Sequence, residues 1–211
     1  MQMNVLEHWN TWWQATANER EEYNLSDTSN WRMAAMKSRN PEDGEWWYAN
    51  GYKFLENWVQ WREENTHMSI AKLDDGTLAI ELELAPVVNG VTVKMAIDRV
   101  FYDSFNKEYV IVDLKTGKTT PHSSLQLAFY AYGIRKQFGL NITKGYYWMA
   151  RKGELSPPHD LAGLDDSKVE TLVDMFDKAR KSGIFLPNFD HCMMCGYTAQ
   201  CQWYTPKEKH E

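Results

Sequence analysis

The spacing of hydrophobic residues divides this chain of 211 residues near position 77. Before that point Trp and charged residues alternate without a strand-like period, and apolar residues between Tyr52 and Glu64 recur at helical spacing. We expect one helical segment over residues 5 to 40, broken around Asn24 to Asn30, and a second helix from Tyr52 to Glu64, separated by a turn at residues 40 to 44. The apolar face of the second helix consists of Phe54, Leu55, Trp58, Val59 and Trp61.

From Thr77 onward the period is two, which predicts a half-buried strand. Leu78, Ile80, Leu82 and Leu84 alternate with Ala79, Glu81, Glu83 and Ala85. Asn89-Gly90 then predicts a tight type I′ turn, with a return strand over Thr92 to Tyr102. The next apolar run, Tyr109 to Lys115, is the most hydrophobic of the three, so we expect it at the centre of a sheet.

The rest of the chain alternates again between helix and strand. A helix is expected from about Ser123 to Phe138, closed by Gly139, followed by a strand over Lys144 to Ala150. A last helix begins at a cap formed by Asp165 or Asp166 and ends at Ser182-Gly183. The fold class is therefore α+β, with an expected division into a helical region, a core and a cysteine-containing segment at residues 1–76, 77–184 and 185–211.

Composition narrows the class of protein. No apolar run approaches the roughly 18 residues of a membrane span, and the first basic residue is Arg20, so the start does not resemble a signal peptide and we expect a cytoplasmic protein. The net charge is 23 − 29 = −6, yet residues 94–152 hold 10 basic and 4 acidic side chains, a balance of +6, while the flanking segments are acidic. This basic middle segment is compatible with a phosphate-binding groove and equally with a solvated mixed surface.

The most specific candidate for a catalytic site lies at the ends of two predicted strands. Asp113 and Lys115 are two residues apart in a strand and therefore share a face, and Asp98 in the neighbouring strand can bring a second carboxylate alongside. Two carboxylates with a lysine form a hard-oxygen site for magnesium or manganese, with the ammonium placed to orient or deprotonate a water. An ordinary surface salt bridge is the alternative. Their place at the end of an apolar strand, where an unpaired charge is costly, favours the metal site.

Gln126 and Tyr130 lie four residues apart on the following helix, hence on one face. With these residues in place, the chain resembles the RecB-like branch of the PD-(D/E)XK nucleases, and specifically the CRISPR-associated-type exonucleases that many bacteriophages encode. The resemblance covers about residues 77 to 204. It rests on the order of five motifs, namely Ala96-Ile97-Asp98-Arg99-Val100, Val112-Asp113-Leu114-Lys115-Thr116-Gly117-Lys118, Gln126 to Tyr130, Gly145-Tyr146-Tyr147-Trp148-Met149 and a cysteine cluster.

The resemblance implies a restriction-endonuclease-like core, a mixed sheet flanked by helices. It implies that Asp98 and Asp113 are metal ligands, that Lys115 is the catalytic lysine, and that the Gln126 and Tyr130 pair contacts DNA near the active site. Glu81 matches a glutamate common on the strand before the hairpin and is taken as a further catalytic candidate. From the basic middle segment, Arg99 and Lys118 complete the expected DNA-binding set.

Cys192, Cys195 and Cys201 form a C-x₂-C-x₅-C cluster. Such a cluster points to metal ligation, and plain buried thiols are the alternative. In the resembling family this triplet and an N-terminal cysteine hold a 4Fe-4S cluster. This chain has no fourth cysteine, so a histidine, a solvent molecule, a missing N-terminal cysteine or a partner chain would complete the site, and zinc with His191 is the competing arrangement.

The chain also departs from the family at its start. It has no Cys-Pro segment, and Leu55 stands where the histidine of a Gly-x-x-x-His motif would follow Gly51. We therefore expect a chain that lacks the first part of the family domain, with its sites completed by an absent segment or by a partner chain.

Three functions are compatible with these features. The first is a magnesium- or manganese-dependent DNA exonuclease acting on single-stranded ends, in phage DNA recombination, repair or processing in the host cytoplasm. The second is a catalytically weak DNA-binding or recombination-accessory protein that keeps the nuclease fold. The third is a zinc-stabilised interaction module, which accounts for the cysteines but not for the carboxylates at the strand ends. Asp98, Asp113 and Lys115 favour the first, because a pure binder has no need of two carboxylates beside a phosphate backbone.

Overall fold

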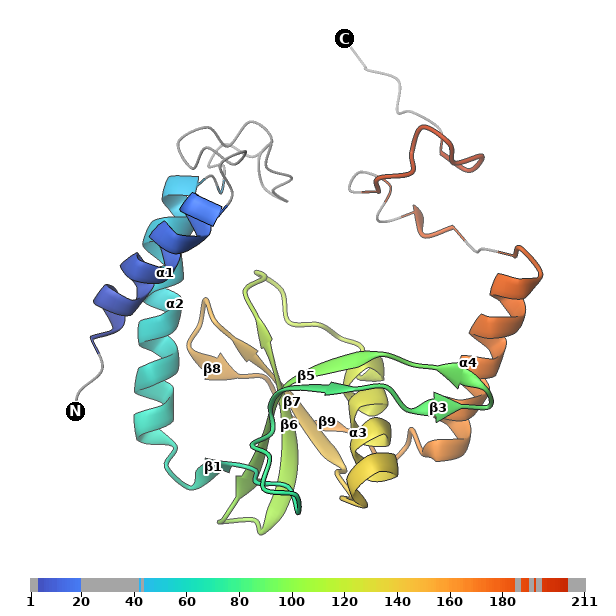
Figure 1. Cartoon of the computed structure of the whole chain (residues 1–211), viewed down its shortest axis with the longest axis horizontal. Coiled ribbons are helices and arrows are strands. Elements are labelled where there is room, and N and C mark those ends of the chain that lie inside the picture. Colours follow the sequence, from blue (N-terminus) through green and yellow to red (C-terminus); the bar gives the residue numbers. More distant parts are fainter. Residues whose placement is uncertain are drawn as a thin grey trace.

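A curled seven-stranded mixed β-sheet forms the centre of the fold (Figure 1). The computed structural model describes residues 4–19, 42, 44–184, 187–189, 192 and 195–204. Strand order is β1-β5-β6-β7-β8, with β2 also pairing with β5 and β9 with β7. The strands are β1 (Met68–Ile70), β2 (Ile80–Leu84), β5 (Met95–Asp103), β6 (Glu108–Lys115), β7 (Lys144–Met149), β8 (Glu154–Leu155) and β9 (His159–Asp160). The α+β fold class predicted from the sequence is confirmed.

The central position belongs to β6, as its hydrophobicity predicted. It pairs antiparallel with β5 on one side and parallel with β7 on the other. A parallel pair requires a crossover connection, which helix α3 (Leu125–Phe138) provides. Its last residue is followed by Gly139 at φ 68°, a left-handed cap that ends the helix where the sequence predicted.

The two faces of the sheet are covered by different helices. On one face, Leu127, Ala131 and Ile134 of α3 are buried in the same cluster as Ile97 and Ile111 of the sheet. On the other face, α2 (Gly44–Glu64) presents an aromatic core. This core consists of Trp58 and Trp61 packed against Phe101 and Trp148. Residues of β6 alternate between the two cores, which fixes the face on which each of its side chains lies.

The remaining helices lie at the two sides of the sheet. Helix α1 (Val5–Glu19) lies alongside α2, and the Trp9 indole donates a 2.9 Å hydrogen bond to the carbonyl of Tyr48 (Figure 1). Helix α4 (Asp166–Lys181) packs Val169 and Val173 against Tyr132 of α3. Asp165 caps α4 by accepting from the backbone N–H of Lys168 at 3.0 Å, which confirms one of the two predicted caps.

The predicted hairpin is confirmed. Strands β3 (Val87–Val88) and β4 (Val91–Thr92) pair around Asn89 and Gly90, whose φ angles of 50° and 82° are both positive, as a type I′ turn requires. The return segment is divided, however, because the long strand begins only at Met95.

One part of the predicted alternation is wrong. Ala79 is fully buried, whereas Leu78 and Ile80, expected in the core, are exposed. Glu81 adopts a φ of 47°, which turns the chain and shifts the side-chain alternation, so that Leu82 and Leu84 return to the core.

Other boundaries differ more modestly. Helix α2 begins at Gly44 rather than at Tyr52, and strands β1, β8 and β9 were not predicted because two or three residues carry no periodicity. The predicted helix break at Asn24 to Asn30 and most of the turn at residues 40 to 44 lie outside the described residues. Within the described part of the chain, no helix has the length and apolar character needed to cross a membrane.

Candidate active site

Strands β5 and β6 bring two carboxylates together. The register between β5 and β6 ends at the pair Arg99–Val112. One position beyond this pair, Asp98 of β5 lies opposite Asp113 of β6, on the same face of the sheet. Asp98 Oδ2 accepts a 2.6 Å hydrogen bond from the backbone N–H of Leu114. The main chain of β6 therefore fixes the first carboxylate beside the second, as the sequence predicted for these strand ends.

Asp113 is buried, with 2% of its side chain exposed. Burial raises the pKa of its carboxyl above the ordinary value; the Lys115 ammonium opposes this rise and the charge of Asp98 adds to it. The Lys115 ammonium lies 2.5 Å from Oδ2. Apart from that contact, Oδ2 has no hydrogen-bond partner among the described residues. This oxygen therefore has lone pairs free for a cation.

Lys115 is held from two directions. Its ammonium contacts Asp113 and also donates to Gln126 Oε1 at 3.1 Å, while Gln126 Nε2 donates to the Tyr130 hydroxyl at 2.9 Å. The same ammonium lies 5.6 Å from the centre of the Tyr147 ring, whose hydroxyl donates to the carbonyl of Ser123 at 2.8 Å. These contacts join the catalytic lysine candidate to the two helix residues predicted to share a face.

Tyr130 lies in the electrostatic field of the carboxylates. Burial raises the pKa of its hydroxyl, the bond from Gln126 opposes the rise, and the charges of Asp113, Asp98 and Glu81 raise it further. The phenol is therefore protonated at neutral pH. Because Gln126 is the donor in their shared hydrogen bond, the Tyr130 hydroxyl keeps its own proton for another acceptor.

Glu81 and Arg99 form a pair at the rim of this site. Glu81 stands opposite Asp98 in the β2–β5 register, between the pairs Ile80–Arg99 and Leu82–Ile97. Its Oε1 lies 2.9 Å from the guanidinium of Arg99, which also donates to the backbone carbonyl of Asp98. Arg99, expected to bind DNA, is thus engaged by a carboxylate in this structure, and its role toward DNA stays a prediction.

Lys118 is likewise engaged by a carboxylate. Its ammonium lies 2.8 Å from Glu42 Oε1, while Arg151 contacts Glu42 Oε2 at 2.9 Å and donates to the carbonyl of Thr116 at 2.6 Å. The Arg151 guanidinium lies 4.6 Å from the ring centre of Trp46. Burial alone would raise the pKa of Glu42, but the hydrogen bonds from Lys118 and Arg151 lower it below its ordinary value.

Sequence reasoning missed three of these residues, Glu42, Arg151 and Tyr147. Glu42 stood in a segment interpreted only as a turn, and Arg151 was one charge among ten in the basic middle segment. Tyr147 could have been recognised as a neighbour of the site from its position two residues before the end of β7. This strand runs parallel to β6 and pairs Tyr147 with Asp113.

The donor set fits a hard divalent cation. Asp98 and Asp113 offer carboxylate oxygens, and Asp113 Oδ2 is unsatisfied apart from its lysine contact. No group of three or more His, Cys, Asp or Glu side chains in the described part of the chain is arranged to hold a metal ion. Magnesium commonly takes one or two protein carboxylates and completes its shell with water and substrate phosphate oxygens. A two-carboxylate site is therefore compatible with magnesium or manganese.

The cysteines do not form such a donor set. Cys192, Cys195 and Cys201 are free thiols; Cys192 Sγ lies 3.8 Å from the carbonyl of Asn188, and Cys195 Sγ accepts from the N–H of Tyr197 at 3.4 Å. His191 lies outside the described residues. A cluster or zinc at these thiols therefore stays a prediction.

Comparison with known proteins gave one family. A model described as the PD-(D/E)XK nuclease superfamily matches residues 4–202, from just before α1 to the residue after Cys201. No curated protein matches the chain.

Proposed function

We propose that this chain, which belongs to the PD-(D/E)XK nuclease superfamily, is a deoxyribonuclease that uses magnesium or manganese to hydrolyse phosphodiester bonds at DNA ends. One observation carries the proposal. Where the pairing of two adjacent strands ends, Asp98 and Asp113 face each other, and the buried Asp113 Oδ2 has the Lys115 ammonium as its only contact among the described residues. A structural ion pair has no need of the second carboxylate, which raises the pKa of the first.

Each residue of the site would have a different role in hydrolysis. A divalent cation held by Asp98 and Asp113 would polarise the scissile phosphate and lower the pKa of a bound water. Lys115, oriented by Asp113 and Gln126, places a positive charge beside the phosphate, where negative charge grows as water adds and the bond to the leaving oxygen breaks. The Tyr130 hydroxyl can donate a hydrogen bond to a phosphate oxygen, which positions the DNA strand.

Finer assignments within the superfamily are part of the same proposal. The order of motifs supports the RecB-like branch and the CRISPR-associated-type exonucleases of phages, acting on single-stranded DNA ends in recombination, repair or processing. A metal at Cys192, Cys195 and Cys201, as a 4Fe-4S cluster or as zinc, would belong to this assignment, together with a partner chain that completes its fourth ligand.

A nuclease assay tests the proposal. Purified protein is incubated with a 5′-labelled linear single strand and with a covalently closed circular single strand, in EDTA, magnesium or manganese. We expect metal-dependent loss of the linear strand only, and no cleavage by Asp113→Asn. Cleavage of the circle would replace the exonuclease assignment with an endonuclease. If the wild-type protein binds both strands and cleaves neither in any metal, the accessory DNA-binding function replaces the nuclease.

A further inference from the structure

A groove leads away from the candidate active site toward helix α4. Two adjoining hollows form it, with volumes of about 510 Å³ and 360 Å³, and they share the residues Val93, Lys94 and Phe129. The first hollow begins at Gln126 and Tyr130, and the second ends at Phe176 and Arg180. We call this surface the Phe129–Phe176 groove. Through the shared residues it extends from Gln126 and Tyr130 of α3 to Phe176 and Arg180 of α4.

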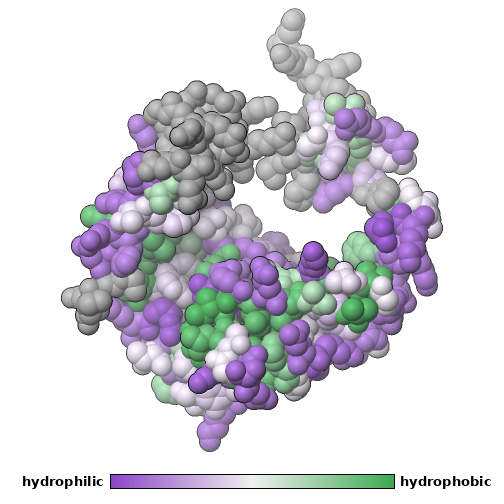
Figure 2. Space-filling model, in the orientation of Figure 1, coloured by the Kyte–Doolittle hydropathy of each residue, from purple (hydrophilic) through white to green (hydrophobic). Residues whose placement is uncertain are grey.

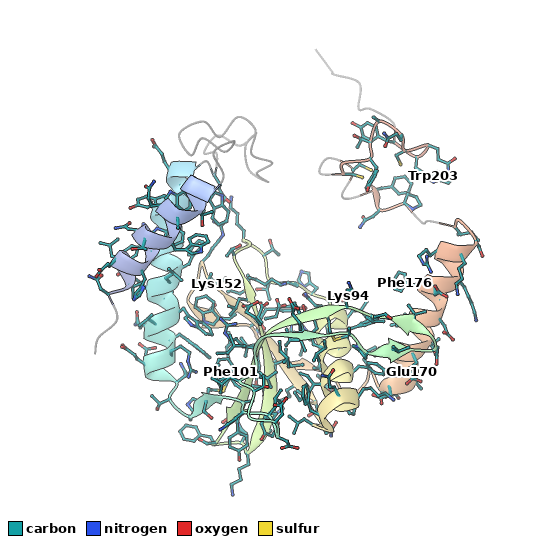
Figure 3. The ribbon with its side chains drawn as sticks, viewed as in Figure 1. Lys94, Phe101, Lys152, Glu170, Phe176 and Trp203 are labelled. Atoms are coloured by element: carbon teal, nitrogen blue, oxygen red, sulfur yellow. The ribbon has the colours of Figure 1, made fainter. Side chains whose placement is uncertain are left out.

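The lining of the groove is mainly apolar and aromatic, and its charged residues are Lys94, Arg180 and Asp177. Phe176 is 66% exposed, although it lies on a helix whose Val169 and Val173 are buried. Figure 3 shows Lys94, in the link between β4 (Val91–Thr92) and β5, on the same side of the molecule as Phe176 of α4. Figure 2 shows apolar surface where the β3–β4 hairpin meets α4. Lys94 is exposed and makes no ion pair with any described residue, whereas Arg180 is paired with Asp177 at 2.8 Å.

This combination matches one kind of ligand. Proteins that bind single-stranded nucleic acid stack unpaired bases on aromatic side chains and hold the backbone with nearby Lys and Arg. A duplex keeps its bases stacked on one another and offers only phosphates and groove edges, so an exposed phenylalanine gains little from it. A free apolar peptide would use the phenylalanines but not the unpaired Lys94 in the middle of the groove.

We propose that the Phe129–Phe176 groove holds the single-stranded end of the DNA substrate as it passes the active site. Bases stack on Phe176 and on the exposed part of Phe129, and Lys94 binds the phosphate between them. The inference rests on the proposed function for the identity of the substrate, and it adds the path that the strand follows and the residues that select single strands.

Binding without cleavage tests the path. Fluorescence anisotropy in EDTA measures the dissociation constants of a labelled 20-nucleotide oligothymidylate and of a blunt 20-base-pair duplex. Because stacking on one aromatic residue contributes about 1–3 kcal/mol per base, Phe176→Ala should weaken oligothymidylate binding about 5- to 150-fold and change duplex binding less than about 2-fold. Lys94→Met should lower the slope of log K against log salt by about 0.7 for the single strand.

The matched control is another exposed phenylalanine. Phe105 is 77% exposed at the turn between β5 and β6, away from the groove, and stacks on His67. Phe105→Ala should bind oligothymidylate as the wild type does. Circular dichroism melting checks that each variant is folded, and Phe176→Leu, which keeps apolar area without a ring, should weaken binding almost as much as Phe176→Ala.

The outcomes separate this inference from the proposed function. If the wild-type protein binds oligothymidylate through Phe176 but never cleaves DNA with metal, the groove stands and the nuclease proposal fails. If the wild-type protein cleaves DNA and Phe176→Ala binds and cleaves equally well, the groove inference is wrong and the nuclease stands. Failure of the wild-type protein to bind oligothymidylate at low salt overturns the inference. So does a wild-type dimer that becomes monomeric in Phe176→Ala, because the groove would then be a subunit interface.

Discussion

Two buried carboxylates in this structure lie in opposite environments, and this difference predicts opposite effects on stability. Glu42 is satisfied by Lys118 and Arg151, and its pKa is lowered. Asp113 is buried beside Asp98 with one oxygen satisfied only by Lys115, and its pKa is raised. We therefore predict that Asp113→Asn stabilises the metal-free protein while abolishing its activity, as expected where a site keeps a charge for function.

The sign follows from proton linkage. A carboxyl whose pKa is raised by folding binds its proton more tightly in the folded state, so its ionisation favours unfolding. The resulting penalty is absent below the ordinary pKa, develops as the pH rises through the raised pKa, and is fully present above it. An asparagine has no such penalty at any pH. The expected gain for Asp113→Asn at pH 7 is therefore about 1 kcal/mol, within the roughly 0.5–2 kcal/mol typical of single stabilising changes.

Glu42→Gln supplies the matched control. It removes the charge from two hydrogen bonds of 2.8 Å and 2.9 Å at a residue that is 7% exposed, and we expect a loss of about 1.5–3 kcal/mol. Because the pKa of Glu42 is lowered, its contribution is present above the unfolded pKa and disappears as the pH falls through the folded one. Glu42→Gln should thus lose less stability on acidification than the wild-type protein.

Urea denaturation in EDTA between pH 4 and pH 8, followed by tryptophan fluorescence, measures both variants. In a thermal melt of the same variants, a change of about 1 kcal/mol in the free energy of unfolding corresponds, for a chain of this length, to a shift of roughly 2–4 °C in Tm. The reasoning is refuted if Asp113→Asn loses more than about 1 kcal/mol in the absence of metal, since Asp113 would then be a structural ion-pair partner of Lys115.

Four further predictions follow from named contacts. At a magnesium concentration a hundredfold above its dissociation constant, the wild-type protein should gain about 2.7 kcal/mol, measured as a rise in Tm, and Asp98→Asn should gain almost nothing. Arg151→Met should cost about 1.5–3 kcal/mol and lower nuclease activity, because it leaves the buried Glu42 with Lys118 alone and removes the hydrogen bond to the Thr116 carbonyl, next to the candidate catalytic Lys115. A wild-type Tm and cleavage rate would contradict this. Asp165→Ala should cost about 1 kcal/mol by removing the cap of α4, with cleavage unchanged; a stability loss below about 0.3 kcal/mol in urea denaturation would contradict the cap. Gly51→Ala would place a Cβ 2.5 Å from the Trp9 ring. We therefore expect a loss of about 1–3 kcal/mol in stability and a changed near-ultraviolet circular dichroism spectrum. An unchanged spectrum would show that α1 does not pack against α2 at Gly51.

Local rules account for the elements that the sequence predicted well. Helices α3 and α4 were recognisable because their ends carry Gly139 and Asp165, which act within one turn of the helix. The hairpin followed from Asn89-Gly90 alone. The opposition of Asp98 and Asp113 was also accessible, because a short turn between two antiparallel strands fixes their register.

The remaining features depend on contacts between distant parts of the chain. The left-handed φ of Glu81 could not be predicted, because nothing in Leu-Ala-Ile-Glu-Leu marks a kink, and the alternation was assumed to continue. The bond between Arg151 and Glu42 joins residues 109 positions apart. No rule based on sequence spacing relates residues so far apart. The contact of Arg151 with the end of β6 was therefore found only in the structure.

The rate of single-turnover cleavage by Lys115→Met tests the central claim most directly. With magnesium and a linear single strand, we predict a rate about 10²–10⁴ lower than that of the wild-type protein. Lys72→Met, which removes an exposed lysine from the segment between β1 and β2, should keep the wild-type rate. Equal rates for Lys115→Met and the wild-type protein would contradict the assignment of the Asp98, Asp113 and Lys115 site as the active site.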